Sequence, residues 1–227
     1  MPMNAMPQPS PASDLSSRAQ PRPDRSDLGQ SIALMGARMS FAKNSEIYGE
    51  GEPADYLYQV VSGTVRTSTF MADGRRQIGG FYRPGDVFGL EIGDEHALSA
   101  EAASDVTVLL VRRSAVLGLA ERDGDVARQL WGATARELTR AQRRMLLLIK
   151  SAQERVVGFL LEMAAQSPGG NAVELPMTRQ DIADYLGLTI ETVSRTLTAL
   201  QGTAMIELTS SRRIRLRNPA ALQDLAA

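Results

Sequence analysis

The stretch that decides the fold reads MTRQDIADYLGLTIETVSRTLTAL and occupies residues 177–200. It predicts two short helices that meet at Gly187, a residue suited to a tight turn. The first helix begins at Thr178 and the second is capped by Thr189, because both are good N-cap residues. The second helix has apolar residues at i, i+4 and i+7, which form a buried face: Val193, Leu197 and Leu200. This pattern is typical of a helix-turn-helix.

The opposite face of the second helix carries side chains that suit base edges. A guanidinium fork matches the major-groove edge of guanine, and a carboxylate accepts a hydrogen bond from cytosine. The alternative is an ordinary surface pair, because Glu191 and Arg195 are also spaced i, i+4. The candidate base contacts are Ile190, Glu191, Ser194 and Arg195.

A second set of hydroxyl and basic side chains suits DNA phosphates, which position a protein without reading sequence. Some of them lie on a predicted hairpin of residues 205–208 and 214–216, where an ordinary solvated charge run is the alternative. The candidate backbone contacts are Thr178, Arg179, Thr189, Thr192, Thr198, Arg212 and Arg213.

Composition indicates a soluble globular protein with room for one large or two small domains. The chain has 227 residues, of which 43% are apolar and 22% are charged. It has no apolar run long enough to span a bilayer and no signal peptide, so we expect a cytoplasmic protein with no membrane partner. The net charge of −1 requires any DNA-binding surface to be a local patch.

The absence of cysteine excludes disulfides, cysteine-ligated zinc and cysteine-held iron–sulfur clusters. The single histidine, His96, disfavours a histidine-based catalytic or metal site. We therefore expect no enzyme activity, no metal and no cofactor. His96 is predicted to be a solvent-exposed loop residue, with a haem ligand as the alternative.

The N-terminal half divides into a tail and a β-rich domain. Residues 1–28 are predicted to be a disordered tail or flexible arm, because six of the 11 prolines fall in the first 23 residues. Residues 29–120 show short alternating runs between turns at Gly63, Gly74 and Gly85, which predict a small β-roll. The expected strands lie within residues 56–70, 77–81, 87–89, 98–103 and 106–111.

A long helix of residues 125–151 follows, within a predicted dimerisation segment of residues 121–152. One face repeats at a 4-3-4-3-4-3-4 spacing, as in a coiled coil. Packing of this helix on its own β-roll is the alternative, and both arrangements can hold. The seam residues are Ala127, Trp131, Thr134, Leu138, Ala141, Met145, Leu148 and Ala152.

The remaining residues, 153–227, are predicted to form a winged helix-turn-helix domain. A helix of residues 155–165, a break at 167–171 and a short strand at 173–175 precede the two helices, and the hairpin follows them. The whole chain is therefore expected to be an α+β protein with a β-roll, a long dimerisation helix and a C-terminal winged helix-turn-helix.

The segment Glu-Thr-Val-Ser-Arg at residues 191–195 resembles the recognition helix of Crp/Fnr regulators. In particular it is similar to the FixK-type branch, which shows Glu-x-x-Ser-Arg. This resemblance implies a homodimeric transcription regulator that binds TTGAT-N4-ATCAA and activates microaerobic or nitrogen-fixation genes.

The β-rich domain resembles the cyclic-nucleotide-binding roll of the same superfamily but lacks its phosphate cassette. The family places Glu after a glycine and Arg on the following strand, whereas Gly89 is followed by Leu90 and the arginine position is Leu98. Without that arginine a buried phosphate has no charge partner, so we expect no cyclic nucleotide.

The resemblance also implies contact with RNA polymerase by the hairpin loop of residues 72–77, although an inert loop is the alternative. The residues concerned are Asp73, Gly74, Arg75 and Arg76.

Two other functions remain open. One is a regulator gated by haem, nitric oxide or another small effector. The other is a β-roll subunit that binds protein rather than DNA. Spectra and the mass of the purified protein separate the first from the main hypothesis, and a gel shift separates the second.

Overall fold

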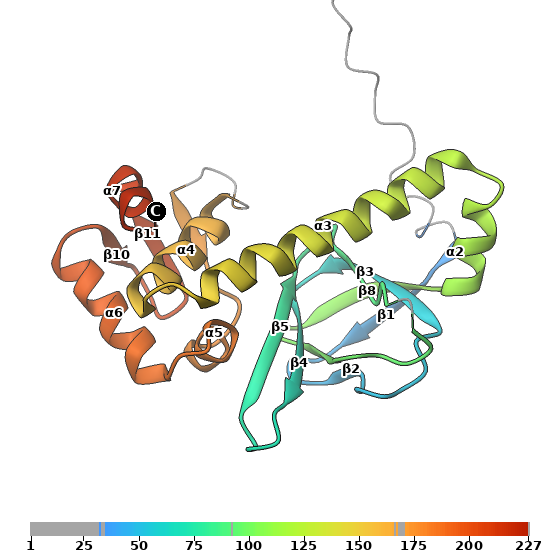
Figure 1. Ribbon diagram of the computed structural model, residues 1–227, viewed down its shortest axis with the longest axis horizontal. Helices are drawn as coiled ribbons and strands as arrows, with labels where there is room; N and C mark the ends of the chain where they lie inside the picture. The colour runs from blue at the N-terminus through green and yellow to red at the C-terminus, as the bar shows by residue number, and fades with distance from the viewer. Residues whose placement is uncertain (1–31, 33–34, 92, 166, 168–170, 227) are drawn as a thin grey trace, which may run out of the picture.

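The computed structural model describes residues 32, 35–91, 93–165, 167 and 171–226. The predicted tail of residues 1–28 lies outside the described residues. A β-roll and a helical domain lie side by side, and the long helix α3 (Gly124–Leu148) runs along both of them (Figure 1). None of the described helices is long and apolar enough to cross a bilayer.

The β-roll that the turn pattern predicts consists of two four-stranded antiparallel sheets, and its strands β1 and β2 were not among those expected. The first sheet has the order β1-β8-β3-β6 and the second has the order β2-β7-β4-β5. Their facing apolar side chains, among them Val65, Phe88 and Val108, form a buried core. The strands are β1 (Ala37–Phe41), β2 (Glu46–Tyr48), β3 (Tyr56–Ser62), β4 (Val65–Phe70), β5 (Arg76–Tyr82), β6 (Val87–Phe88), β7 (Ser99–Ala102) and β8 (Val106–Arg112).

The long helix ends three residues earlier than predicted. α3 stops at Leu148, and α4 (Ala152–Ala165) begins after a short connection. Ser151 and Glu154 bond to each other's backbone N–H groups, which is a capping box that opens a new helix. Ala152 therefore lies in α4, and the expectation that it continues the seam of α3 is wrong.

Two short helices were not anticipated from the sequence. α2 (Arg113–Ala120) connects β8 to α3, and α7 (Pro219–Ala226) follows the C-terminal hairpin and packs on α4. Each has eight residues.

The C-terminal domain has the predicted order of a winged helix-turn-helix. α4 is followed by β9 (Ala172–Glu174), α5 (Arg179–Leu186), α6 (Ile190–Gly202), β10 (Ile206–Leu208) and β11 (Arg213–Leu216). The three strands form a sheet in the order β10-β11-β9.

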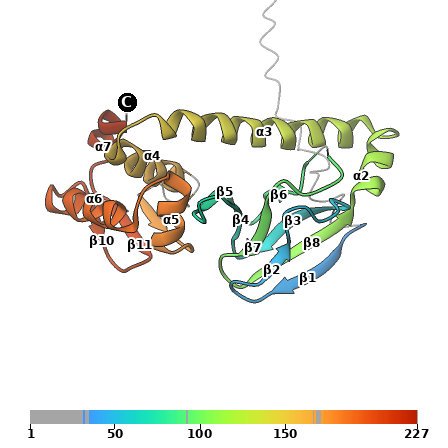
Figure 2. The same cartoon turned by 60° about the horizontal axis from the view of Figure 1, so that its bottom comes forward.

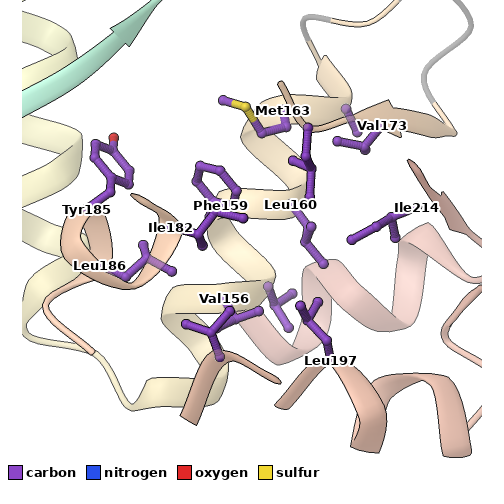
Figure 3. Packing of buried hydrophobic residues seen from close by; sticks show 14 of the residues in the cluster. Val156, Phe159, Leu160, Met163, Val173, Ile182, Tyr185, Leu186, Leu197 and Ile214 are labelled. Atoms are coloured by element: carbon purple, nitrogen blue, oxygen red, sulfur yellow. The ribbon is translucent and has the colours of Figure 1, made fainter. Parts of the chain in front are cut away.

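The core of this domain gathers side chains from α4, α5, α6 and the sheet (Figure 3). Two residues of the roll, Ile78 and Phe81 of β5, belong to the same buried cluster. The Phe81 ring lies 5.4 Å from the Tyr185 ring and 6.5 Å from the Phe159 ring, measured between centroids. The two domains therefore share a hydrophobic core.

Among the turn residues of the roll, Gly63 is the one at which an added side chain is least tolerated. Its φ is +81°, and an added Cβ would lie 2.1 Å from the carbonyl oxygen of Asp105. Gly51 has a similar φ of +80° but no atom within 4 Å of an added Cβ.

We expect Gly51→Ala to lower the free energy of unfolding by about 1–2 kcal/mol, from left-handed backbone strain alone. Gly63→Ala should lower it by about 1–3 kcal/mol more, because the backbone must also move. Urea unfolding at equal protein concentration measures both values. Equal losses would show that the approach to Asp105 does not constrain the turn.

Candidate DNA-binding interface

The helix-turn-helix is fixed by three local devices. The Thr178 side chain caps α5, and Asp181 completes a capping box there. Gly187 adopts φ +62° in the turn, where a glycine avoids the steric cost of a Cβ. The Thr189 side chain accepts from the backbone N–H of Thr192 and so caps α6.

The predicted base-contact residues share one outer face of α6. Val193, Leu197 and Leu200 are buried on the inner face. The side chains of the opposite face are all exposed: Ile190, Glu191, Ser194 and Arg195.

The charges on this face suit base edges. Bonds from its own backbone N–H and from Thr189, with the charge of Arg195, lower the pKa of the Glu191 carboxyl, so it is ionised. Within the described part of the chain no carboxylate comes within ion-pair distance of Arg195, so the alternative i, i+4 surface pair is not formed.

The phosphate-contact candidates differ in how many hydrogen-bond donors they leave open. The Thr178 N–H and O–H both donate to the Asp181 carboxylate, at 2.9 and 2.7 Å. The Thr198 hydroxyl donates to the Ser194 carbonyl. Arg179 is half-buried, burial lowers its pKa, and its Nη1 has no hydrogen-bond partner among the described residues. Because this Nη1 atom is itself buried, it does not face a phosphate as the side chain stands, and none of the three presents an open donor.

The wing is the hairpin of β10 and β11, and it presents exposed arginines. Two carboxylates oppose these arginines, although the hairpin itself contains only one of them. Glu207 lies 2.7 Å from Arg217 and 3.7 Å from Arg215, as expected for the acidic residue of the hairpin. Glu174, on the neighbouring strand β9, lies 3.9 Å from Arg213. Arg212 is exposed and pairs with no carboxylate in the described residues, which leaves it the most open to a phosphate.

The tip of the β4–β5 hairpin is only partly open to a partner. Asp73, Gly74 and Arg75 are exposed, and Arg75 pairs with Asp73 at 2.7 Å. Arg76 was expected on this exposed surface, and that expectation is wrong. Its guanidinium turns to α5 and binds Asp181 and Asp184, at 2.6 and 2.8 Å. Phe70 and Met71, which we did not predict, add exposed apolar area beside the tip.

The contact between the hairpin and α5 was not predicted. The Asp181 carboxylate is 1% exposed and also accepts bonds of 3.3 Å from Arg66. Burial raises its pKa, but the bonds from Thr178 and the charges of both arginines outweigh burial and hold it below the usual range. The only local sign in the sequence was the spacing Thr178-x-x-Asp181, which indicates a capping box but not the arginines.

The seam of α3 is largely exposed in the single chain, and Thr134, Leu138 and Ala141 of the seam line a cavity beside the roll. Val126 and Ala133 are buried against the roll, whereas Trp131, Leu138 and Met145 are 77%, 60% and 63% exposed. Thr134 and Ala141 are also exposed, and Ala127 and Leu148 are half-buried. The helix therefore packs on its own roll and also carries an apolar stripe that the described residues of the single chain leave largely exposed.

A cavity of about 330 Å³ lies between the roll and α3. Leu90 and Leu98 line it, and its charged lining residues are Glu91 and Glu137. These carboxylates would repel a phosphate, and none of the described residues that line the cavity is an arginine or a lysine that could bind one. The residues present therefore do not fit a cyclic nucleotide.

His96 is buried, so the expectation of an exposed loop residue is wrong. Its ring stacks on Tyr48 at a centroid distance of 3.5 Å, and Nδ1 lies 3.4 Å from Glu91. Backbone bonds between His96 and both Gly51 and Glu52 hold the loop against the turn that follows β2. No cluster of three or more potential metal ligands occurs in the described residues.

Comparison with known proteins agrees with this geometry. Residues 38–123 match the cyclic nucleotide-binding domain, and residues 154–225 match the Crp-like helix-turn-helix domain. The chain is 50% identical over 202 residues to the nitrogen fixation regulation protein FixK of Azorhizobium caulinodans, covering 86% of this chain and 82% of that protein. It is 40% identical to FixK of Rhizobium meliloti, with coverage of 85% and 89%.

The structure of FixK2 from Bradyrhizobium japonicum is similar over nearly its whole length. The TM-score is 0.82 at 51% identity, and the alignment covers 86% of this chain and 98% of that chain. Its relatives are transcription regulators rather than enzymes. The chain therefore belongs to the Crp/Fnr superfamily of transcription regulators and is of the FixK type.

Proposed function

We propose that the chain binds palindromic sites of the TTGAT-N4-ATCAA type as a homodimer, without an effector, and activates transcription. The observation that carries this proposal is the outer face of α6, where Glu191, Ser194 and Arg195 are exposed together. Relatives named as nitrogen fixation regulators support control of microaerobic or nitrogen-fixation genes. A gene regulator of this kind works in the cytoplasm.

Dimerisation is needed because one chain supplies one recognition helix. A palindrome presents its half-sites about 34 Å apart, so two helices must be held at that spacing. The exposed apolar stripe of Trp131, Leu138 and Met145 supports α3 as the helix that pairs.

Activation requires contact with RNA polymerase. We assign this contact to Asp73, Gly74 and Arg75 at the hairpin tip, with Phe70 and Met71 beside them. The exposure of all five residues supports this assignment.

The cavity between the roll and α3 favours one alternative, a regulator gated by an uncharged effector. A DNA-binding assay on protein that native mass spectrometry shows to be free of small molecules decides between the two functions. Tight binding by that protein supports effector-free action, whereas binding that appears only with an added ligand supports gating.

Arg195→Ala should weaken binding to the palindrome by about 1–3 kcal/mol per half-site. It should also reduce discrimination at the guanine, because the guanidinium fork is removed. Fluorescence anisotropy with matched and guanine-substituted duplexes measures both effects. Arg122→Ala, at an exposed position between α2 and α3, is the control. Wild-type affinity of Arg195→Ala would show that α6 does not read this base.

Arg213→Ala should weaken binding to all sequences alike. The slope of log K against log salt should fall by about 0.9 for each phosphate that the protein no longer neutralises, and a dimer would release two such phosphates. A salt titration with specific and unrelated duplexes tests this. Weaker binding to the specific duplex alone would contradict a phosphate role.

Met145→Asp should give a monomer that no longer binds the palindrome, because two like charges would face each other across the two-fold axis. Thr139→Asp adds the same charge at an exposed position off the seam and should remain dimeric. Light scattering and circular dichroism separate loss of dimer from loss of fold. A dimeric Met145→Asp, or a monomeric wild type at micromolar concentration, would place the interface elsewhere.

A further inference from the structure

Strand β5 of the roll makes polar contacts with α5 of the helix-turn-helix and with the long helix α3. Arg76 binds two carboxylates of α5, at Asp181 and Asp184. The neighbouring Gln77 amide donates to the Asp184 carbonyl at 2.6 Å. Two residues further on, the Gly79 carbonyl accepts from Arg144 of α3 at 2.9 Å. Both views of the fold draw β5 beside α5 (Figures 1 and 2).

The Asp181 carboxylate joins this contact to the start of the helix-turn-helix. Its Oδ1 accepts from Arg66 and Arg76 of the roll, at 3.3 and 2.6 Å. Its Oδ2 accepts from the Thr178 N–H and hydroxyl, which form the N-terminal cap of α5. A shift of the roll relative to α5 would therefore leave a buried carboxylate or a buried guanidinium without its partner.

The apolar contact alone does not fix an orientation as sharply. Ile78 and Phe81 pack against the domain core, but hydrophobic contact is non-directional. Charge-assisted bonds to two carboxylates one helical turn apart do set a direction, because the fork of Arg76 must meet both.

We propose that Arg66 and Arg76 are positioning residues for DNA binding, which hold α5 and hence the recognition helix in one orientation before DNA is met. This inference rests on the proposed function and extends it to the source of effector-free binding. A chain in which only a fraction of molecules has the competent orientation binds DNA with an affinity reduced by that fraction. Because the contact of Arg66 and Arg76 with α5 keeps the molecules in the competent orientation, the DNA affinity is not reduced in this way and no ligand is needed.

Two substitutions that remove charges of opposite sign distinguish the positioning role from a simple electrostatic effect on DNA affinity. Arg76→Gln removes a positive charge from the roll, and Asp184→Asn removes a negative charge from the DNA-binding domain. Simple electrostatics predicts that Asp184→Asn binds DNA more tightly. Positioning predicts that both variants bind about tenfold more weakly, and that the double variant is no weaker than the weaker single variant.

Arg76→Lys keeps the charge but removes the fork, so its affinity should lie between those of wild type and Arg76→Gln. Arg38→Gln removes one exposed arginine from β1 of the same roll and should bind as wild type. Thermal unfolding identifies any variant that does not keep its fold. If Arg76→Gln does not fold, Asp184→Asn carries the test from the other side of the contact.

A distance measurement reports the orientation directly. The chain has no cysteine, so a Gln201→Cys background places one spin label per protomer at the end of α6. Free protein should give one narrow distance distribution, which does not change on DNA. Arg76→Gln should give a broad distribution that narrows when DNA binds.

Three results decide the matter. A narrow distribution and wild-type affinity in both Arg76→Gln and Asp184→Asn would overturn the positioning role, as would tighter binding by Asp184→Asn. If the wild-type protein does not bind the palindrome, the proposed function fails. The distance distributions of the free proteins would still show whether the arginines fix the orientation.

Discussion

The burial of one carboxylate constrains the arrangement of both domains. Asp181 occupies the third position of α5, where a short acceptor is needed to complete the helix cap. Because it is almost inaccessible to water, its charge must be balanced by the protein. The balance comes from Arg66 and Arg76, on two strands of the other domain. The need to cap one helix thus decides where the roll lies.

The roll keeps a shape known from nucleotide sensors while its chemistry has changed. The cavity beside α3 persists, but Glu91 and Glu137 stand where an anion would require positive charge. Tyr48 lines the cavity and stacks on the buried ring of His96. In this chain the roll is better suited to supporting the DNA-binding domain than to holding a charged ligand.

The sequence predicted those parts of the structure that depend on neighbours along the chain. The caps at Thr178 and Thr189, the turn at Gly187 and the periodicity of α6 are local, and the two helices lie where they were expected. The break after Leu148 was also encoded locally, by Ser151 and Glu154, but the continuing heptad pattern obscured it.

The errors concern contacts between residues far apart in the chain. Arg76 reads as part of an exposed hairpin because its partner in α5 lies 105 residues away. His96 reads as an exposed loop residue because its stacking on Tyr48 becomes visible only when β2 pairs with β7. A DNA contact likewise involves a partner far from any sequence neighbour. The roles assigned to the DNA-contact residues are therefore inferred from the exposed face that they share.

The placement of Ile78 and Phe81 in the core of the neighbouring domain bears on how such chains can evolve. A cut after α3 separates two sequence modules, but it also strips Phe159 and Tyr185 of the aromatic side chain that covers them. Recombination that joins this winged helix to a foreign roll would expose that apolar surface unless the new roll brought a matching strand.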